Sequence, residues 1–146
     1  MRWQATVLAS TLAVVLAAAC SSTTTPAGKA PVKLGGTAWL AEDIDGKGVV
    51  DRVQSTIEFV DDQRAAGSLA CNRYTTTYSA DATGLRFGTI GATRRMCPPA
   101  LMEQESRFSA ALEGTRGLRF ESNGALLLLD ADGRVRARLM PAPLSK

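Results

Sequence analysis

The chain has 146 residues, of which 45% are hydrophobic and 21% charged, and it carries a net charge of +3 with no histidine. This is the length of one domain and an ordinary globular composition, which excludes a disordered chain and a polytopic membrane protein. The small net charge does not predict nucleic-acid binding. Without histidine, Ser-His-Asp and Cys-His nucleophile systems and the usual zinc ligand sets are also excluded.

The N-terminal residues have the pattern of a secretory leader. Arg2 is followed by an uncharged apolar stretch over 5–19, shorter than the roughly 20 residues that a spanning helix needs. Three alanines then precede Cys20, which resembles a bacterial lipoprotein signal whose cleavage leaves a lipidated cysteine at the new N-terminus. We therefore predict a signal peptide at 1–19, lipid attachment at Cys20 and a flexible polar tether over 20–33. The alternative is cleavage after the alanines that leaves Cys20 as a free thiol.

From Leu34 onward, apolar residues recur mainly at every second position between turn signals, the pattern of short antiparallel strands. The expected strands are 37–44, 55–60, 68–79, 85–90, 118–120, 125–130 and 134–140. Asn123-Gly124 and Asp132-Gly133 are turn residues that suit hairpins. The sequence therefore predicts a mainly β domain over 34–141, an antiparallel meander curved into a small, partly open barrel.

One segment, 99–113, breaks the strand pattern and predicts a single helix. Pro98 and Pro99 suit a helix start, and Gly114 suits its end. A helix of about 13 residues is marginal alone, so we expect it to pack on the sheet and close one end of the barrel.

Glu105 lies within the apolar stripe that Phe108 and Leu112 continue along this helix. A carboxylate on a packing face is costly without a partner, and the basic candidates are Arg94 and Arg95, just upstream. Glu105 is therefore interpreted as a structural partner, with a ligand-site acid as the alternative.

Cys71 and Cys97 remain once Cys20 is assigned to the lipid. An even pair in an exported chain predicts one disulfide. The loop that it closes, about 27 residues long, contributes roughly 3 to 4 kcal/mol in the chain-entropy model. We expect this disulfide to tie a core strand to the start of the helix.

Arginines occupy every second position of the last expected strand, at Arg134, Arg136 and Arg138. Such a face could bind an anionic lipid or polymer. The alternative is a solvated strand face that discourages edge-to-edge aggregation.

Several motifs, in this order, resemble the META domain family, also called HslJ-like, of small bacterial envelope proteins. Segment 36–39 is similar to its G-T-x-W strand, 70–78 to its G-C-N-x-Y segment, 93–97 loosely to T-x-M-A-C, and 105–108 to E-x-x-F. The resemblance covers about residues 34–140. It implies a barrel-like curved sheet with one helix. The matched residues, which it implies are structural, are Gly36, Thr37, Trp39, Asn72, Tyr74, Tyr78, Thr93, Glu105 and Phe108.

The family has no agreed biochemical activity, although some members are linked to heat shock and to tolerance of the antibiotic novobiocin. We therefore expect a non-enzymatic envelope lipoprotein without a metal or other cofactor. It would act as a binding or assembly-support module in envelope stress or antibiotic tolerance. Its expected partners are the membrane, through the lipid, and an unidentified envelope protein. Ser21 after Cys20 resembles the signal for the outer membrane, so we expect the domain to face the periplasm.

Two alternatives stay open. One is a proteinaceous inhibitor of a hydrolase, such as a lysozyme or a protease, which would present segment 61–67 or 91–99 as a rigid exposed loop. The other is a carrier of an acyl chain or a small apolar ligand inside a partly open barrel.

Overall fold

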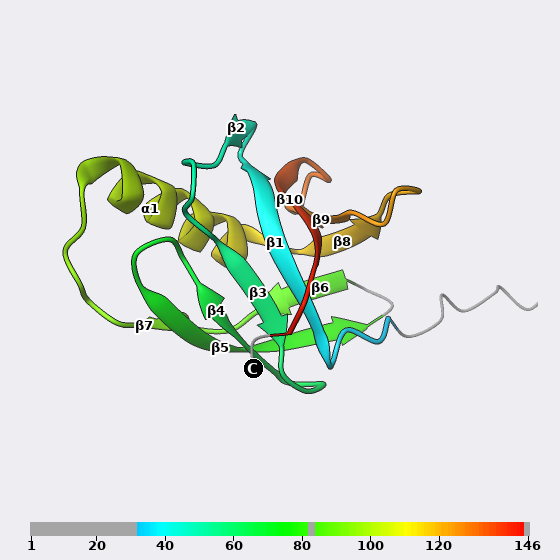
Figure 1. The fold of residues 1–146 in the computed structure, drawn as a ribbon. Coiled ribbons are helices and arrows are strands. Elements are labelled where there is room, and N and C mark those ends of the chain that lie inside the picture. Colours follow the sequence, from blue (N-terminus) through cyan, green and yellow to red (C-terminus); the bar gives the residue numbers. More distant parts are fainter. Residues whose placement is uncertain (1–31, 82–83, 145–146) are drawn as a thin grey trace, which may run out of the picture.

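The computed structural model describes residues 32–81 and 84–144, which form a strongly bent antiparallel sheet with one helix against it (Figure 1). The elements in chain order are β1 (Thr37–Ile44), β2 (Lys47–Gly48), β3 (Thr56–Phe59), β4 (Arg64–Ser68), β5 (Arg73–Asp81), β6 (Gly84–Phe87), β7 (Gly91–Ala92), α1 (Pro99–Gly114), β8 (Gly117–Phe120), β9 (Leu126–Leu129) and β10 (Val135–Ala142). The predicted mainly β fold with one helix is confirmed, and the helix ends one residue beyond the expected boundary.

The sheet runs in the order β6-β5-β4-β3-β1-β10-β9-β8, and all of its pairs are antiparallel. Its two outer strands, β6 and β8, come into contact. Gly84, at the start of β6, approaches the Arg116 carbonyl so closely that a Cβ atom would lie 2.1 Å from its oxygen. The sheet is therefore nearly closed into a barrel, as the strand pattern predicted.

The expected single strand over 68–79 is wrong. The chain there forms two strands, with β4 ending at Ser68 and β5 beginning at Arg73. Leu69 N donates to Asn72 O at 2.8 Å and closes the turn between them. The apolar and polar alternation runs through this turn without a glycine or proline signal, which is why the sequence pattern alone did not divide the two strands.

The core lies inside the bent sheet and is closed by α1. Along β5, Tyr74, Thr76 and Tyr78 are buried and the intervening residues are exposed, so the period-2 prediction holds within this strand. The Phe59 and Tyr78 rings meet edge to face with centroids 4.8 Å apart. The helix buries one face, made of Gln104, Phe108, Ala111 and Leu112.

The folded part begins slightly before the predicted boundary at Leu34, because Val32 already packs against the core. The predicted signal peptide and Cys20 lie outside the described residues, as does most of the predicted tether. Over the described ranges, the structure contains no helix with the length and hydrophobicity to span a bilayer.

Candidate functional site

A buried amide, Asn72, joins three parts of the molecule. Its side chain lies in the turn between β4 and β5 and is 1% exposed. Its Oδ1 accepts hydrogen bonds from Thr93 Oγ1 at 2.8 Å and from Arg95 N at 2.7 Å. Its Nδ2 donates to Arg95 O at 3.1 Å and to Glu105 Oε1 at 2.9 Å. All four hydrogen-bonding positions of the carboxamide are thus in use, and they connect the turn, the segment after β7 and the helix.

Glu105 is paired with Asn72 and not with the arginines that the sequence suggested. Besides the bond from the Asn72 side chain, Glu105 Oε2 accepts the backbone N–H of Asn72 at 2.8 Å. Arg94 and Arg95 are exposed, so the prediction that they pair with Glu105 is wrong. Two N–H groups of one residue satisfy the carboxylate, and they orient the Asn72 amide toward the segment after β7.

The disulfide between Cys71 and Cys97 forms in the structure, with its Cα atoms 6.2 Å apart. It fixes the C-terminal end of the segment after β7, next to the start of α1. At the other end, β7 pairs with β5, and Thr93 N donates to Arg73 O at 3.0 Å. Residues 91–98, called the clamped loop from here on, are therefore held at both ends and, through Asn72, in the middle.

The clamped loop exposes the side chains of Arg94, Arg95 and Met96, and Met96 is 90% exposed. Within residues 32–81 and 84–144, neither arginine side chain makes an ion pair or hydrogen bond. Figure 1 shows the connection from β7 to α1 projecting at one end of the molecule, away from β8 and β10. The backbone of the loop is fixed while its cationic side chains are free for a partner.

The first motif fixes the start of β1. Gly36 has φ +81, a left-handed conformation that favours glycine. Thr37 Oγ1 donates to Leu34 O at 2.6 Å and accepts Trp39 Nε1 at 2.9 Å. Phe108 is fully buried against the same core. These contacts hold the start of β1, and Phe108 lies in the buried face of α1.

The two tyrosines of β5 donate to backbone carbonyls. Tyr74 Oη donates to Thr56 O at 3.0 Å, and Tyr78 Oη donates to Asp61 O at 2.6 Å. Burial raises the pKa of Tyr74 well above its usual value. Burial also raises the pKa of Tyr78, with the nearby carboxylates of Asp62 and Asp61 adding to the effect. Both phenols therefore stay protonated near neutral pH and serve as fixed donors.

Sequence reasoning missed a second buried polar chain around Gln104. This side chain is fully buried and accepts Val50 N at 2.6 Å while donating to Ser55 Oγ at 3.0 Å. Ser55 Oγ in turn donates to Leu69 O at 2.6 Å. The available signal was a glutamine beside Glu105 on the packing face of the helix, where a polar residue needs a partner.

The arginine row of Arg134, Arg136 and Arg138 is matched by carboxylates. The pairs are Arg134 with Asp130 and Asp132, Arg136 with Asp45, and Arg138 with Glu42 and Glu121. A bulge between Val135 and Ala137 leaves Val135 exposed, so the expected regular alternation fails at that residue. Because each guanidinium already has an anionic partner, this arrangement favours the alternative of a solvated strand face over an anionic contact surface.

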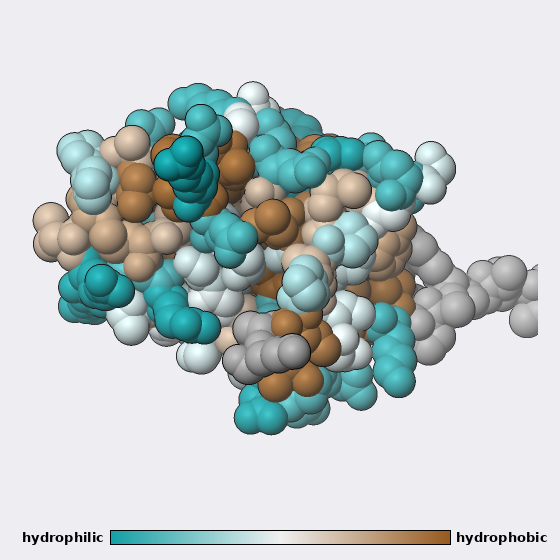
Figure 2. All heavy atoms as spheres, viewed as in Figure 1, coloured by the Kyte–Doolittle hydropathy of each residue, from teal (hydrophilic) through white to brown (hydrophobic). Residues whose placement is uncertain are grey.

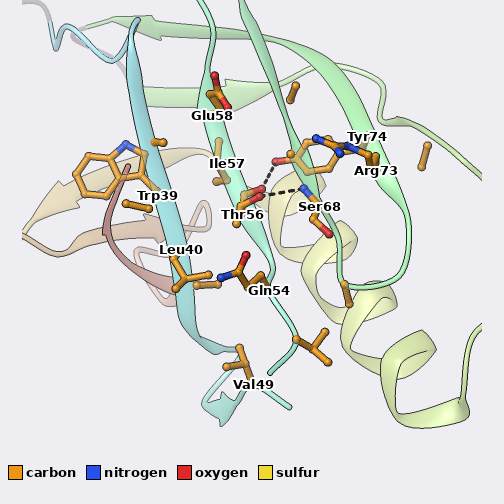
Figure 3. Close-up of a pocket in the computed structure, with 18 of the residues that line it drawn as sticks. Trp39, Leu40, Val49, Gln54, Thr56, Ile57, Glu58, Ser68, Arg73 and Tyr74 are labelled. Carbon is orange, nitrogen blue, oxygen red and sulfur yellow. Dashed lines mark hydrogen bonds between the residues drawn. The ribbon is translucent and has the colours of Figure 1, made fainter. Parts of the chain in front are cut away.

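A broad hollow, the outer groove, lies on the outer face of β1, β3, β4 and β5 (Figure 3). Thr56 lies at its centre, where its carbonyl accepts Tyr74 Oη and its Oγ1 accepts Ser68 N at 3.0 Å. Gly91, Ala92 and Thr93, at the start of the clamped loop, also line it. Figure 2 shows this face as a mosaic of hydrophilic and hydrophobic side chains. Polar and apolar groups both line this surface.

The hollow lies outside the barrel, whereas the interior is packed. Phe59, Phe108, Leu112 and Leu128 are fully buried there. This packing does not favour carriage of an acyl chain inside the barrel. In the part of the chain that the structure describes, no group of three or more His, Cys, Asp or Glu residues is placed to hold a metal ion.

Within residues 32–81 and 84–144, a nearly closed antiparallel sheet, one helix and a disulfide-held loop define a small β-barrel-like domain. The META domain family model matches residues 32–142, and the chain belongs to this family. No curated protein matches it.

Two solved structures share the fold. An NMR structure of a protein from Burkholderia xenovorans is 24% identical with a TM-score of 0.60, covering 76% of this chain and 85% of its own. A second NMR structure is 25% identical with a TM-score of 0.58, covering 73% and 90%. Both share the architecture of this chain.

Proposed function

We propose that the protein is a lipid-anchored, non-enzymatic module of the bacterial cell envelope that binds a protein partner through the clamped loop and the adjoining outer groove. The proposal rests on the difference between the polar groups that bond within the fold and those that do not. Asn72, Glu105 and the disulfide all hold the clamped loop in place. The side chains of Arg94 and Arg95 extend from it with no partner among the described residues. Such an arrangement suits recognition, because a pre-organised loop loses little conformational freedom on binding.

The proposed anchor is the lipid on Cys20, and the proposed location is the outer membrane facing the periplasm. The leader and Ser21 support this placement. A binding or assembly-support role in envelope stress or antibiotic tolerance accords with the family. Labelled palmitate should enter the wild-type protein, and Cys20→Ser should move it out of the membrane fraction. Unchanged fractionation of Cys20→Ser would contradict the anchor.

Site-specific photocrosslinking in intact cells tests the binding face. A photoreactive residue replacing Arg94 should crosslink an envelope protein, and the same residue replacing Arg134 should not. Arg134 is the matched control because it is also exposed but paired with Asp130 and Asp132. Equal crosslinking from the two positions, or none from position 94, would contradict the proposed face.

A hydrolase inhibitor is the second candidate function. Its two candidate loops differ in how their arginines are paired. Segment 61–67 spans the β3–β4 hairpin, where Arg64 pairs with Asp61 at 2.6 Å. Segment 91–99 contains the clamped loop, whose arginines pair with no other residue of 32–81 or 84–144. The second segment therefore has the features that an inhibitory loop requires: exposure, rigidity and side chains available to a cleft.

A further inference from the structure

We propose that Arg94 is the residue by which the clamped loop binds and inhibits a serine protease that cleaves after arginine. The inference rests on the proposed function as a protein-binding module, and it names the partner class by its chemistry. The partner has an active-site cleft with an anionic pocket for an arginine side chain. The clamped loop would enter this cleft as a substrate does.

The first support is the position of the Asn72 amide relative to Arg94. Asn72 binds the residue on each side of Arg94: Thr93 through its hydroxyl at 2.8 Å, and Arg95 through its backbone N–H at 2.7 Å and its carbonyl at 3.1 Å. None of these bonds uses a backbone group of Arg94. A protease must hydrogen-bond the backbone of the residue before the scissile bond and place its carbonyl in the oxyanion hole. Arg94 meets this requirement, whereas the backbone of Arg95 is already occupied.

The second support is that the clamp itself is held rigidly. Glu105 binds both the side chain and the backbone of Asn72 at 2.9 and 2.8 Å. The Cys71–Cys97 disulfide fixes the chain three residues after Arg94, and pairing of β7 with β5 fixes it two residues before. A loop ordered before binding has already lost this conformational entropy, so it loses less on binding than a flexible peptide does.

The third support is charge. Arg94 is exposed and unpaired among the described residues. An arginine-specific protease has a carboxylate at the base of its specificity pocket, with which a guanidinium can form a bidentate, charge-assisted pair. Gly91 and Ala92, on the N-terminal side of Arg94, are small and line the outer groove, so they leave room for the walls of a cleft.

The clamp also explains why such a complex would persist. Attack of the protease serine oxygen on the Arg94 carbonyl carbon forms an acyl-enzyme and breaks the Arg94–Arg95 bond. The serine proton passes through the protease histidine to the Arg95 nitrogen. Because Asn72 still holds Arg95, the released amine stays beside the ester and can attack it. This reverse step re-forms the peptide bond, returns the proton and frees the serine, so intact inhibitor is regenerated.

The test measures trypsin activity on a chromogenic arginine substrate in the presence of the full mature lipoprotein in non-ionic detergent. Wild type should inhibit stoichiometrically. Arg94→Ala should weaken inhibition by about 100-fold or more, the loss expected for a central anchor residue. Arg94→Lys should stay within about tenfold of wild type, since lysine keeps the charge but not the bidentate geometry. Arg119→Ala, an exposed arginine of β8, is the matched control and should change nothing.

A second measurement tests the clamp. Asn72→Ala should be cut by trypsin between Arg94 and Arg95, as mass spectrometry would show, while wild type resists cleavage at equal concentration. Because this variant could unfold, circular dichroism must first show native structure. If it is not native, Thr93→Val tests the same clamp from the loop side, and it should raise the cleavage rate by a smaller factor.

Other outcomes would overturn the proposal. Rapid cleavage of folded wild type at Arg94, or full inhibition by Arg94→Ala, would contradict the proposed inhibition through Arg94. Inhibition of chymotrypsin that is lost in Met96→Ala would assign the contact to Met96 instead. If trypsin is not inhibited but a photoreactive residue at position 94 still crosslinks an envelope protein, this inference fails and the proposed function stands. If trypsin is not inhibited and position 94 gives no crosslink, both this inference and the proposed function fail.

Discussion

Two sets of arginines, one on β10 and its preceding turn and one in the clamped loop, are held in opposite ways. In the arginine row of Arg134, Arg136 and Arg138, side chains are matched to carboxylates, from neighbouring strands and turns. In the clamped loop, the backbone is bound, and the side chains of Arg94 and Arg95 have no partner in the part of the chain that the structure describes. The charges of the arginine row form ion pairs within the fold. The fold holds the clamped loop so that its charges face the solvent. An arginine-rich stretch in the sequence therefore indicates a contact surface only when its charges are left uncompensated.

The largest expected effect comes from removing the disulfide that fixes the clamped loop. The double substitution Cys71→Ser and Cys97→Ser should lower the free energy of unfolding by about 3.5 kcal/mol, since the unfolded chain regains the entropy of the closed loop. Guanidinium chloride unfolding measures this loss, and reduced wild type should unfold at the same midpoint as the variant. A loss below about 1 kcal/mol would show that the loop is held without the disulfide.

The second effect concerns the amide at the centre of the clamp. Asn72→Ala leaves a carboxylate oxygen of Glu105 and the N–H of Arg95 without partners, which should cost about 3 kcal/mol. Asn123→Ala is the matched control. That exposed asparagine accepts one bond, from Ala125 N at 3.0 Å, and its loss should cost below about 1 kcal/mol. If the two variants lose equal free energy of unfolding in chemical denaturation, Asn72 does not stabilise the clamp as described.

A direct comparison of the two regions sets Arg136→Ala against Arg94→Ala. Arg136 is 28% exposed; its Nε lies 2.6 Å from Asp45 Oδ1 without donating a hydrogen bond, and its Nη2 donates to Oδ2 at 3.2 Å. Loss of this partly buried pair should cost about 1 kcal/mol, whereas Arg94→Ala should leave the unfolding midpoint unchanged. Destabilisation by Arg94→Ala would mean that its side chain supports the fold after all.

The smallest effect is a change in one carboxyl pKa. Partial burial opposes ionisation of Asp130, but the Arg134 backbone N–H and guanidinium, together with the Asp132 N–H, outweigh it and hold the pKa of Asp130 below 3.8. Stability from this group is therefore present above its unfolded pKa and is lost as the pH falls through the folded value. Carbon-13 NMR titration should show the pKa rising in Arg134→Ala. It should not move in Arg94→Ala, and a shift there would couple the two regions.

The sequence predicted those features that depend on neighbouring residues. Helix α1 followed from prolines at its start and Gly114 at its end. Most strands followed from period-2 alternation between turns. The disulfide followed from the cysteine count together with the predicted secretory leader. In each case the physical cause lies within a few residues, or in a small number of pairing options.

The clamp and the arginine pairs were beyond sequence reasoning because they depend on the strand order. Glu105 meets Asn72 across 33 positions, and its charge suggested an arginine as the partner rather than an amide. Arg138 reaches Glu42 because β10 lies beside β1, a neighbour relation that spans nearly the whole domain. The split between β4 and β5 was missed for a related reason, since the turn at Asn72 is stabilised by the helix.

The Asn72 clamp also constrains the order of folding. Its amide connects to residues 21, 23 and 33 positions away, so it closes only after β5 has formed and α1 has docked on the sheet. Such contacts form after the local contacts of the helix and hairpins, because their loop-closure entropy must be overcome first, although the β1–β10 pairing spans a longer separation. In stopped-flow refolding, a fluorophore on the clamped loop should settle after the helical circular dichroism signal. The surface that we propose for partner binding is then ordered only once the helix has docked, so its ordered form indicates that the turn, the loop and the helix are already assembled.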